Sequence, residues 1–346
     1  KKDDAQLLKP DKEQIEKKEE DDALKPRDNE SNKKQEDHKK TEEEKEKLFE
    51  KLQIITDRFT IVKRLGGGGF GEVFLAKDSK TGSLVAIKTE RTDVLHPQLP
   101  IEKDVFTIMS STVNCPVMHH FGTHGEFTVL VMELLGPSLE DLLNFCGRRF
   151  TPKTLCMVIE QGLRGLEALH NRSIIHRDLK PENFLLGLGK KAHVVHLIDF
   201  GLCKNYRHPL TFDHIAFRTG KTLTGVMWQL PWMSIKISNR RKRNEKLAEV
   251  KESLTPSDLC AGLPPEFELF FKYCRTLSYT QRPDYGYLRN LLVSVIYRLK
   301  EQFDYFYDWY SVAKMFKNNL DAGKPILPKK KPTTQMSSTP NVTPKA

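Results

Sequence analysis

The chain has 346 residues, of which 38% are hydrophobic, and a formal net charge of +10, which is enough for one folded domain with polar tails. No secretory signal is visible and no apolar run approaches the ~18 residues that a membrane span needs, so we expect no membrane association and a cytoplasmic or nuclear protein. The first residue is Lys1 rather than Met, which predicts an incomplete N-terminus.

The cysteines show no Cys-x-x-Cys spacing, a pattern typical of reduced thiols rather than of a disulfide framework or a zinc site. The six of them are Cys115, Cys146, Cys156, Cys203, Cys260 and Cys274.

Charge is unevenly distributed along the chain. Residues 1–50 hold 14 Lys and Arg and 18 Asp and Glu, a net charge of −4, so the remainder carries +14. A basic body can attract nucleic acid, but acidic or phosphorylated protein substrates suit it equally well. No nucleic-acid module is recognisable, so we expect protein partners and no nucleic acid.

The first 57 residues are predicted to form a disordered, charged arm. Residues 1–50 mix Lys, Glu and Asp with almost no aromatic residues, the composition of a solvated segment. A charged helix over Glu42–Leu52 is the alternative.

From Phe59 the pattern changes to short apolar runs typical of strands, separated by the glycine run Gly66–Gly69 and by the hairpin turn Lys80-Thr81-Gly82. The predicted strands are Phe59–Leu65, Glu72–Ala76, Leu84–Glu90 and Thr128–Glu133.

Helical periodicity follows in Leu139–Phe145, Thr154–His170, Pro265–Leu277 and Tyr287–Glu301. A β-rich first lobe followed by a helical second lobe predicts an α+β fold. We place the N-lobe at 58–133, the C-lobe at 134–315 and a disordered tail at 316–346. Its Lys329-Lys330-Lys331 run is either a nuclear-import patch or a solvated charge run.

The motif Gly66-x-Gly68-x-Phe70-Gly71-x-Val73 has the glycines that let backbone N–H groups approach a polyphosphate. A strand rather than a helix follows, which favours a hairpin loop over a Rossmann turn. The predicted nucleotide-binding residues here are Leu65, Gly66, Gly67, Gly68, Gly69, Phe70, Gly71, Glu72 and Val73.

Lys88 ends the apolar run Val85-Ala86-Ile87, 22 residues after Gly66. An inward lysine there would contact the α- and β-phosphates and would need a carboxylate from a nearby helix. Glu102, 14 residues further on, is the candidate. A surface lysine and an exposed helical glutamate are the alternatives.

The segment His176-Arg177-Asp178-Leu179-Lys180-Pro181-Glu182-Asn183 is the most specific motif. One loop supplies an aspartate that accepts a hydroxyl proton, a lysine for the transferring phosphoryl charge and an asparagine for Mg²⁺: Asp178, Lys180 and Asn183. Asp199-Phe200-Gly201 follows 16 residues after Asn183 and adds a second Mg²⁺ ligand, Asp199, after the apolar run 194–198.

These motifs together resemble those of the eukaryotic protein kinase superfamily. The sequences of several further segments resemble the casein kinase I group, which includes the tau-tubulin kinases. The resemblance covers about residues 58–312. The stretches that carry it are Leu130–Leu139, Leu223-Thr224-Gly225, Leu230-Pro231-Trp232, Pro283-Asp284-Tyr285 and Phe303-Asp304-Tyr305.

The resemblance implies a two-lobed protein kinase domain over 58–315 that uses ATP and Mg²⁺, and we expect it to be a monomer. Lys180 at its position implies serine/threonine substrates, and the group's acidic or phosphorylated target sites are expected. Met132 would be the gatekeeper, with the backbone of Glu133–Leu135 facing adenine. The nucleotide site would also include Ala86, Glu133, Leu135, Leu185 and Ile198.

One segment departs from the family. Only Val226–Gln229 separates Gly225 from Leu230, where the family pattern has about thirty more residues, including a buried C-lobe helix with a bracing aspartate. We expect a C-lobe lacking this core segment and attribute the gap to a skipped exon or a faulty gene model. A kinase-like module that binds nucleotide or partners without turnover is the alternative function.

The gap also affects substrate choice. Arg218 and Lys221 match two members of the family's basic substrate-anion site, but a third, an arginine just past Leu-Thr-Gly, is absent. Solvated loop charges are the alternative for these two, as for the basic run Arg240-Arg241-Lys242-Arg243.

Overall fold

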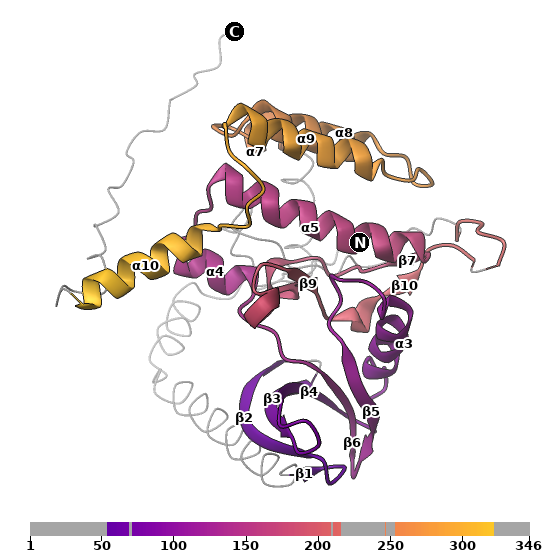
Figure 1. Ribbon diagram of the computed structural model, residues 1–346. Coiled ribbons are helices and arrows are strands. Elements are labelled where there is room, and N and C mark those ends of the chain that lie inside the picture. Colours follow the sequence, from indigo (N-terminus) through magenta and orange to yellow (C-terminus); the bar gives the residue numbers. More distant parts are fainter. Residues whose placement is uncertain (1–53, 69–70, 209, 216–245, 247–252, 322–346) are drawn as a thin grey trace, which may run out of the picture. The chain divides into compact units, whose positions relative to one another are not determined.

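The computed structural model describes residues 54–68, 71–208, 210–215, 246 and 253–321 (Figure 1). The predicted arm up to residue 53, the junction at 226–229, Gly69, Phe70, Arg218, Lys221 and the tail from 322 onward lie outside the described residues.

Six strands form one sheet in the order β1-β2-β3-β4-β6-β5, and the pairings of β4 and β5 with β6 are antiparallel. The β4–β6 register sets Lys88 opposite Leu130 and Ala86 opposite Met132. The strands are β1 (Ile54–Ile55), β2 (Phe59–Gly68), β3 (Gly71–Asp78), β4 (Leu84–Arg91), β5 (Met118–His124) and β6 (Phe127–Glu133).

The chain divides into two compact units, the smaller of which contains the described residues 54–64 and 76–83. Within it, the Arg58 guanidinium donates to both carboxylate oxygens of Asp78 at 2.8 and 2.7 Å. These bonds hold the pKa of Asp78 well below its usual range. The predicted turn Lys80-Thr81-Gly82 is confirmed, because Gly82 has a φ of 72° and donates to the carbonyl of Asp78.

The larger unit contains residues 65–75 and everything described from Leu84 onward, including all the helices. The four predicted helices are confirmed, Leu139–Phe145 with its predicted bounds and the other three with shifted ends, and the predicted tail boundary at 316 falls inside α10. The helices are α3 (Leu99–Met109), α4 (Leu139–Phe145), α5 (Pro152–Asn171), α7 (Pro256–Leu259), α8 (Pro265–Thr276), α9 (Tyr285–Arg298) and α10 (Asp308–Asp321).

Short elements follow α5 between residues 174 and 205. β7 (Ile174–Ile175) pairs with β10 (Lys204–Asn205), and β8 (Phe184–Leu186) pairs with β9 (Val195–Leu197), both antiparallel. Three single 3₁₀ turns join them: η1 (Pro181–Asn183), η2 (Gly189–Lys191) and η3 (Phe200–Leu202). The two β-pairs frame the loops that carry the predicted catalytic and metal-binding residues.

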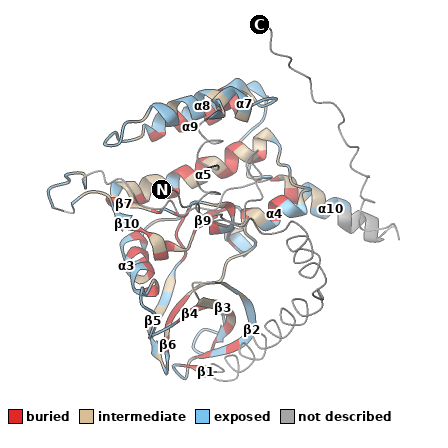
Figure 2. Cartoon of the chain, turned by 180° about the vertical axis from the view of Figure 1, so that it is seen from behind, coloured by how far each residue is buried: buried red, intermediate tan, exposed pale blue. Residues whose placement is uncertain are grey.

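Three groups of buried side chains stabilise the larger unit. Figure 2 marks the buried residues of its helices and strands in red. The first joins α3, β6, α5 and η3 and includes Phe106, Leu130, Leu169 and Phe200. The second joins α5, α8 and α9. The third joins α4, α5 and the start of α10 around the fully buried Tyr307.

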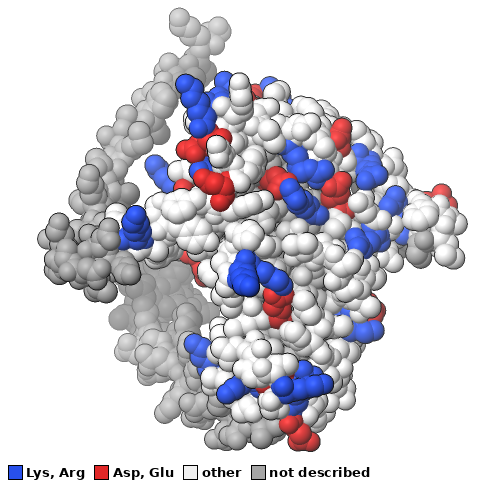
Figure 3. All heavy atoms as spheres, viewed as in Figure 1, with Lys and Arg blue, Asp and Glu red and all other residues white. Residues whose placement is uncertain are grey.

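This is the predicted α+β architecture, a sheet-rich N-lobe followed by helices. No helix among the described residues is both long and apolar enough to cross a bilayer. On the face drawn in Figure 3, basic and acidic side chains are interspersed rather than gathered by sign.

Candidate active site

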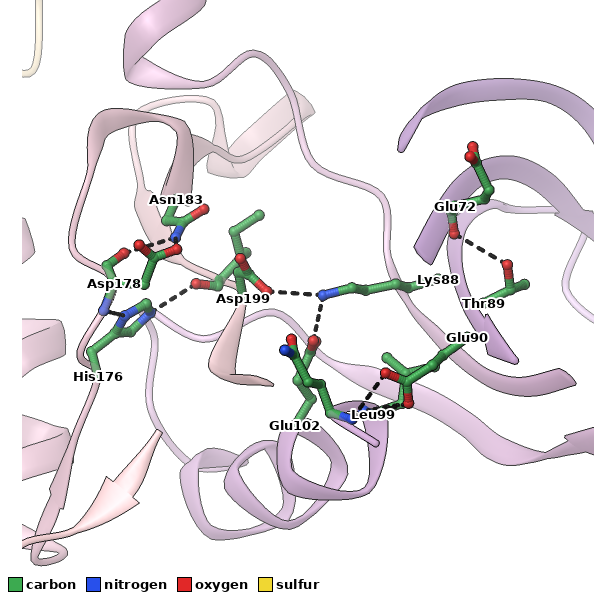
Figure 4. Close-up of polar contacts among 12 residues, drawn as sticks. Glu72, Lys88, Thr89, Glu90, Leu99, Glu102, His176, Asp178, Asn183 and Asp199 are labelled. Atoms are coloured by element: carbon green, nitrogen blue, oxygen red, sulfur yellow. Dashed lines mark hydrogen bonds and ion pairs between the residues drawn. The ribbon is translucent and has the colours of Figure 1, made fainter. Parts of the chain in front are cut away.

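Lys88, Glu102 and Asp199 meet in one cluster, in which the first two are buried and Asp199 is partly buried, although they come from β4, α3 and the residue before η3 (Figure 4). Lys88 Nζ donates to Glu102 Oε1 and lies 2.9 Å from Asp199 Oδ1. Glu102 is 1% exposed and Lys88 9% exposed, so both alternatives to the predicted pair, a surface lysine and an exposed glutamate, are wrong.

Burial and charge act against each other in this cluster. Burial alone would lower the pKa of Lys88, but the carboxylates of Glu102 and Asp199 outweigh it and raise that pKa. Burial also disfavours the anion of Glu102, and despite Lys88 its pKa rises to about 7. The pKa of Asp199 is lowered, because the Lys88 charge more than offsets burial. Lys88 therefore remains a fixed cation.

The Asp-Phe-Gly segment is held by packing on both sides. Phe200 is fully buried, with its ring edge-on to Phe106 at 5.2 Å and to His176 at 5.7 Å between ring centroids. Asp199 adopts a left-handed conformation, φ 63° and ψ 65°. A Cβ on Gly201 would lie 2.7 Å from Gln98 Oε1, so a larger residue there would displace the Gln98 side chain. This packing fixes the direction in which Asp199 points.

The catalytic loop brings its three predicted residues together. Asp178 Oδ2 accepts from Lys180 Nζ at 2.7 Å and from Asn183 Nδ2 at 3.2 Å, and the Asn183 amide also donates to the backbone carbonyl of Asp178 at 2.8 Å. Both Asp178 and Asn183 are buried. The loop therefore presents a carboxylate and an ammonium group side by side.

His176 connects this loop to the Asp-Phe-Gly segment, a role that the sequence motif alone did not indicate. Its Nε2 lies 2.9 Å from the carbonyl of Ile198, and its Nδ1 accepts from the backbone N–H of Asp178 at 3.3 Å. Burial lowers the pKa of His176, so the ring is neutral and carries its proton on Nε2. The burial of His176 is the feature that indicates this role, and burial of a single histidine cannot be deduced from the sequence.

The residues predicted to hold Mg²⁺ are suited to it, because carboxylate and amide oxygens are the ligands that this ion prefers. Asn183 uses its amide nitrogen on Asp178, which leaves the carbonyl oxygen as its metal-binding group. Lys88 engages only Oδ1 of Asp199. No group of three or more His, Cys, Asp or Glu side chains able to hold a metal occurs among the described residues.

The described glycines of this loop lie at the end of β2 and the start of β3, where Gly71 approaches the backbone of β4 closely. Gly71 has a φ of 118°, and a Cβ there would lie 2.0 Å from the Thr89 carbonyl, so no other residue fits. A Cβ on Gly67 would meet the Glu72 carboxylate, whereas Gly66 faces open space. Gly69 and Phe70 lie outside the described residues, and the polyphosphate contact of this loop stays a prediction.

Of the residues predicted around adenine, some lie on strands β2, β3, β4 and β6 of the large sheet, Leu185 lies on β8, and Leu135 and Ile198 lie outside the strands. Ala86 is buried opposite Met132, and Met132, Glu133, Leu135, Leu185, Ile198 and Val73 are partly buried, while Leu65 is exposed. The Glu133 side chain contacts Lys191 and the amide of Val117, and its own N–H donates to the Val117 carbonyl. The side chain and the N–H of Glu133 are therefore engaged within the protein, and a contact of its carbonyl with adenine stays a prediction.

Residues 59–220 match the family model described as the protein kinase domain. The matched region contains the sheet from β2 onward, the Lys88–Glu102–Asp199 cluster and the whole catalytic loop. The α+β fold is consistent with a two-lobed kinase fold, and the match supports a place in the eukaryotic protein kinase superfamily.

Proposed function

We propose that the protein is a serine/threonine kinase of the casein kinase I kind. It transfers the γ-phosphoryl group of Mg·ATP to serine or threonine side chains of acidic or already phosphorylated proteins, and it acts as a monomer. The observation that carries the proposal is the 2.7 Å pair of Asp178 and Lys180 in one loop. Lys180 at this position is the feature that favours a hydroxyl on serine or threonine over one on tyrosine.

The side chains of this site would have complementary roles in such a transfer. Lys88 would hold the α- and β-phosphates, while Asp199 and Asn183 would hold the Mg²⁺ that neutralises them. Asp178 would orient the substrate hydroxyl, whose oxygen bonds to the γ-phosphorus as the bond to the leaving ADP oxygen breaks, and would take the hydroxyl proton. Catalysis then rests on positioning and electrostatics.

A transfer assay tests the proposal. The purified full chain is incubated with Mg·ATP and casein or a phospho-primed peptide, and Asp178→Asn serves as the matched control. We expect transfer by the wild type to exceed that of Asp178→Asn by about 10²-fold or more, the usual contribution of a positioned base. Transfer no greater than that of the control would refute a catalytic role.

The sequence gap at Val226–Gln229 favours a second candidate, a nucleotide-binding module without turnover. Mg·ATP at a hundred times its Kd stabilises a protein by about 2.7 kcal/mol, so a rise in melting temperature reports binding independently of catalysis. Binding without transfer would support the module. Arg218 and Lys221 lie outside the described residues, and their role in substrate choice is part of the proposal.

A further inference from the structure

Glu90 is a buried carboxylate that takes no part in the proposed phosphoryl transfer. It lies two residues after Lys88 on β4, so both side chains leave the same face of the strand. Glu90 is 6% exposed, and buried carboxylates are kept only where they are well paired. Its partners are the backbone N–H groups of Gln98 at 2.9 and 3.0 Å and of Leu99 at 3.2 Å (Figure 4).

These two N–H groups are the first of α3. A helix leaves its first four N–H groups without partners inside the helix. Gln98, at the cap position of α3, makes no side-chain cap, and the third of the four positions is Pro100, which has no N–H. Glu90 therefore supplies from β4 the cap that the helix lacks in its own sequence, and its negative charge complements the helix dipole.

The cap connects the two elements that carry the central ion pair. β4 holds Lys88, and α3 holds Glu102 one turn after the capped residues. We propose that Glu90 is a positioning residue, which fixes the start of α3 to β4 so that Glu102 stays within reach of Lys88. The proposal rests on the proposed kinase function only for its kinetic consequence, because the link between β4 and α3 is a property of the protein without substrate.

The test uses the full chain with three variants. Glu90→Gln removes the charge and keeps the volume, whereas Glu90→Ala removes the whole cap. Asp284→Ala is the matched control, because Asp284 caps α9 by accepting from Tyr287 N–H at 2.8 Å and lies on the surface outside the site. The readouts are amide hydrogen exchange by region, kcat and KM for ATP.

We expect exchange in residues 98–109 to rise about fivefold or more in Glu90→Ala and less in Glu90→Gln, the usual scale of a lost cap, with α5 unchanged. We expect kcat to fall about tenfold with KM for ATP changed less than threefold, since a misplaced group costs rate more than binding. Asp284→Ala should raise exchange in α9 alone and leave kcat unchanged.

Three results would overturn the proposal: unchanged exchange in α3, an equal rise in α3 and α5, or faster exchange in α3 with an unchanged kcat. If the wild type itself transfers no phosphate, the proposed function fails, while regional exchange still decides whether Glu90 holds α3 to β4.

Discussion

Glu102 combines deep burial with two charged neighbours, and this combination makes its protonation depend on pH near neutrality. Its pKa of about 7 lies above the ordinary glutamate value, mainly because burial penalises the anion. A carboxyl with a higher pKa in the folded than in the unfolded state binds its proton more tightly when folded. The resulting stability is complete below the unfolded pKa and is lost as pH rises through about 7.

This predicts a pH-dependent difference between the wild type and Glu102→Gln. As pH rises from about 5 to about 8, the melting temperature of the wild type should fall relative to that of the variant, because only the wild type loses the proton at this site. Thermal unfolding of both proteins across this range, without nucleotide, measures the difference. A difference that stays constant, or that favours the wild type at higher pH, would contradict the assignment.

At the scale of elements, β9 is held by side chains from α5 and from the segment before α10. The Tyr307 hydroxyl donates to the His193 carbonyl at 2.8 Å and accepts from Gln161 Nε2 at 2.7 Å. Gln161 Oε1 accepts from the N–H of Val195, the first residue of β9. Since β9 ends two residues before Asp199, these bonds set where the Asp-Phe-Gly segment begins.

Tyr307→Phe should therefore lower stability by about 1–2 kcal/mol, because the hydroxyl loses two hydrogen bonds in a fully buried place. The melting temperature should fall by about 2–4 °C for each kcal/mol in a domain of this size. Tyr310→Phe is the control, because its partly buried hydroxyl makes a single long bond of 3.4 Å to Ala192. If the melting temperature falls equally in the two variants, the hydrogen bonds of the Tyr307 hydroxyl do not stabilise the fold more than the single bond of Tyr310.

At the scale of the whole molecule, the sequence predicted the catalytic loop and the metal ligands because their chemistry needs fixed residue types at fixed spacing. Asp178, Lys180 and Asn183 come from one loop, so their proximity required no knowledge of the fold. Glu102 was predicted from a requirement for a partner carboxylate, and the structure confirms the contact.

Other features depend on tertiary contacts that local patterns do not encode. β5 was not predicted, because Met118–His124 is rich in histidine and contains a glycine, and only pairing with β6 makes it a strand. The capping role of Glu90 was missed because a glutamate at a strand end looks like an exposed residue until α3 packs beside it. The helix predicted from Thr154 begins at Pro152, since the Thr151 hydroxyl caps it.

Because most of the cysteine thiols are buried, the rates at which they react measure local unfolding of the regions around them. All six cysteines are free, and burial raises the pKa of Cys115, Cys156 and Cys203 to about 12. Thiolate, the form that alkylating reagents attack, is therefore scarce at these positions while the chain is folded. Cys274 is the exposed member of the set and should react first at neutral pH.

Two of the thiols with a raised pKa lie in different regions, so their reaction rates report on different parts of the fold. Cys203 belongs to the cluster around Phe200, and Cys156 belongs to the cluster between α5 and α9. Alkylation rates read by mass spectrometry would thus distinguish a local release of the Asp-Phe-Gly segment from a loosening of the helical layer. Mg·ATP should slow alkylation of Cys203 more than that of Cys156, and equal slowing would indicate that nucleotide stabilises both regions alike.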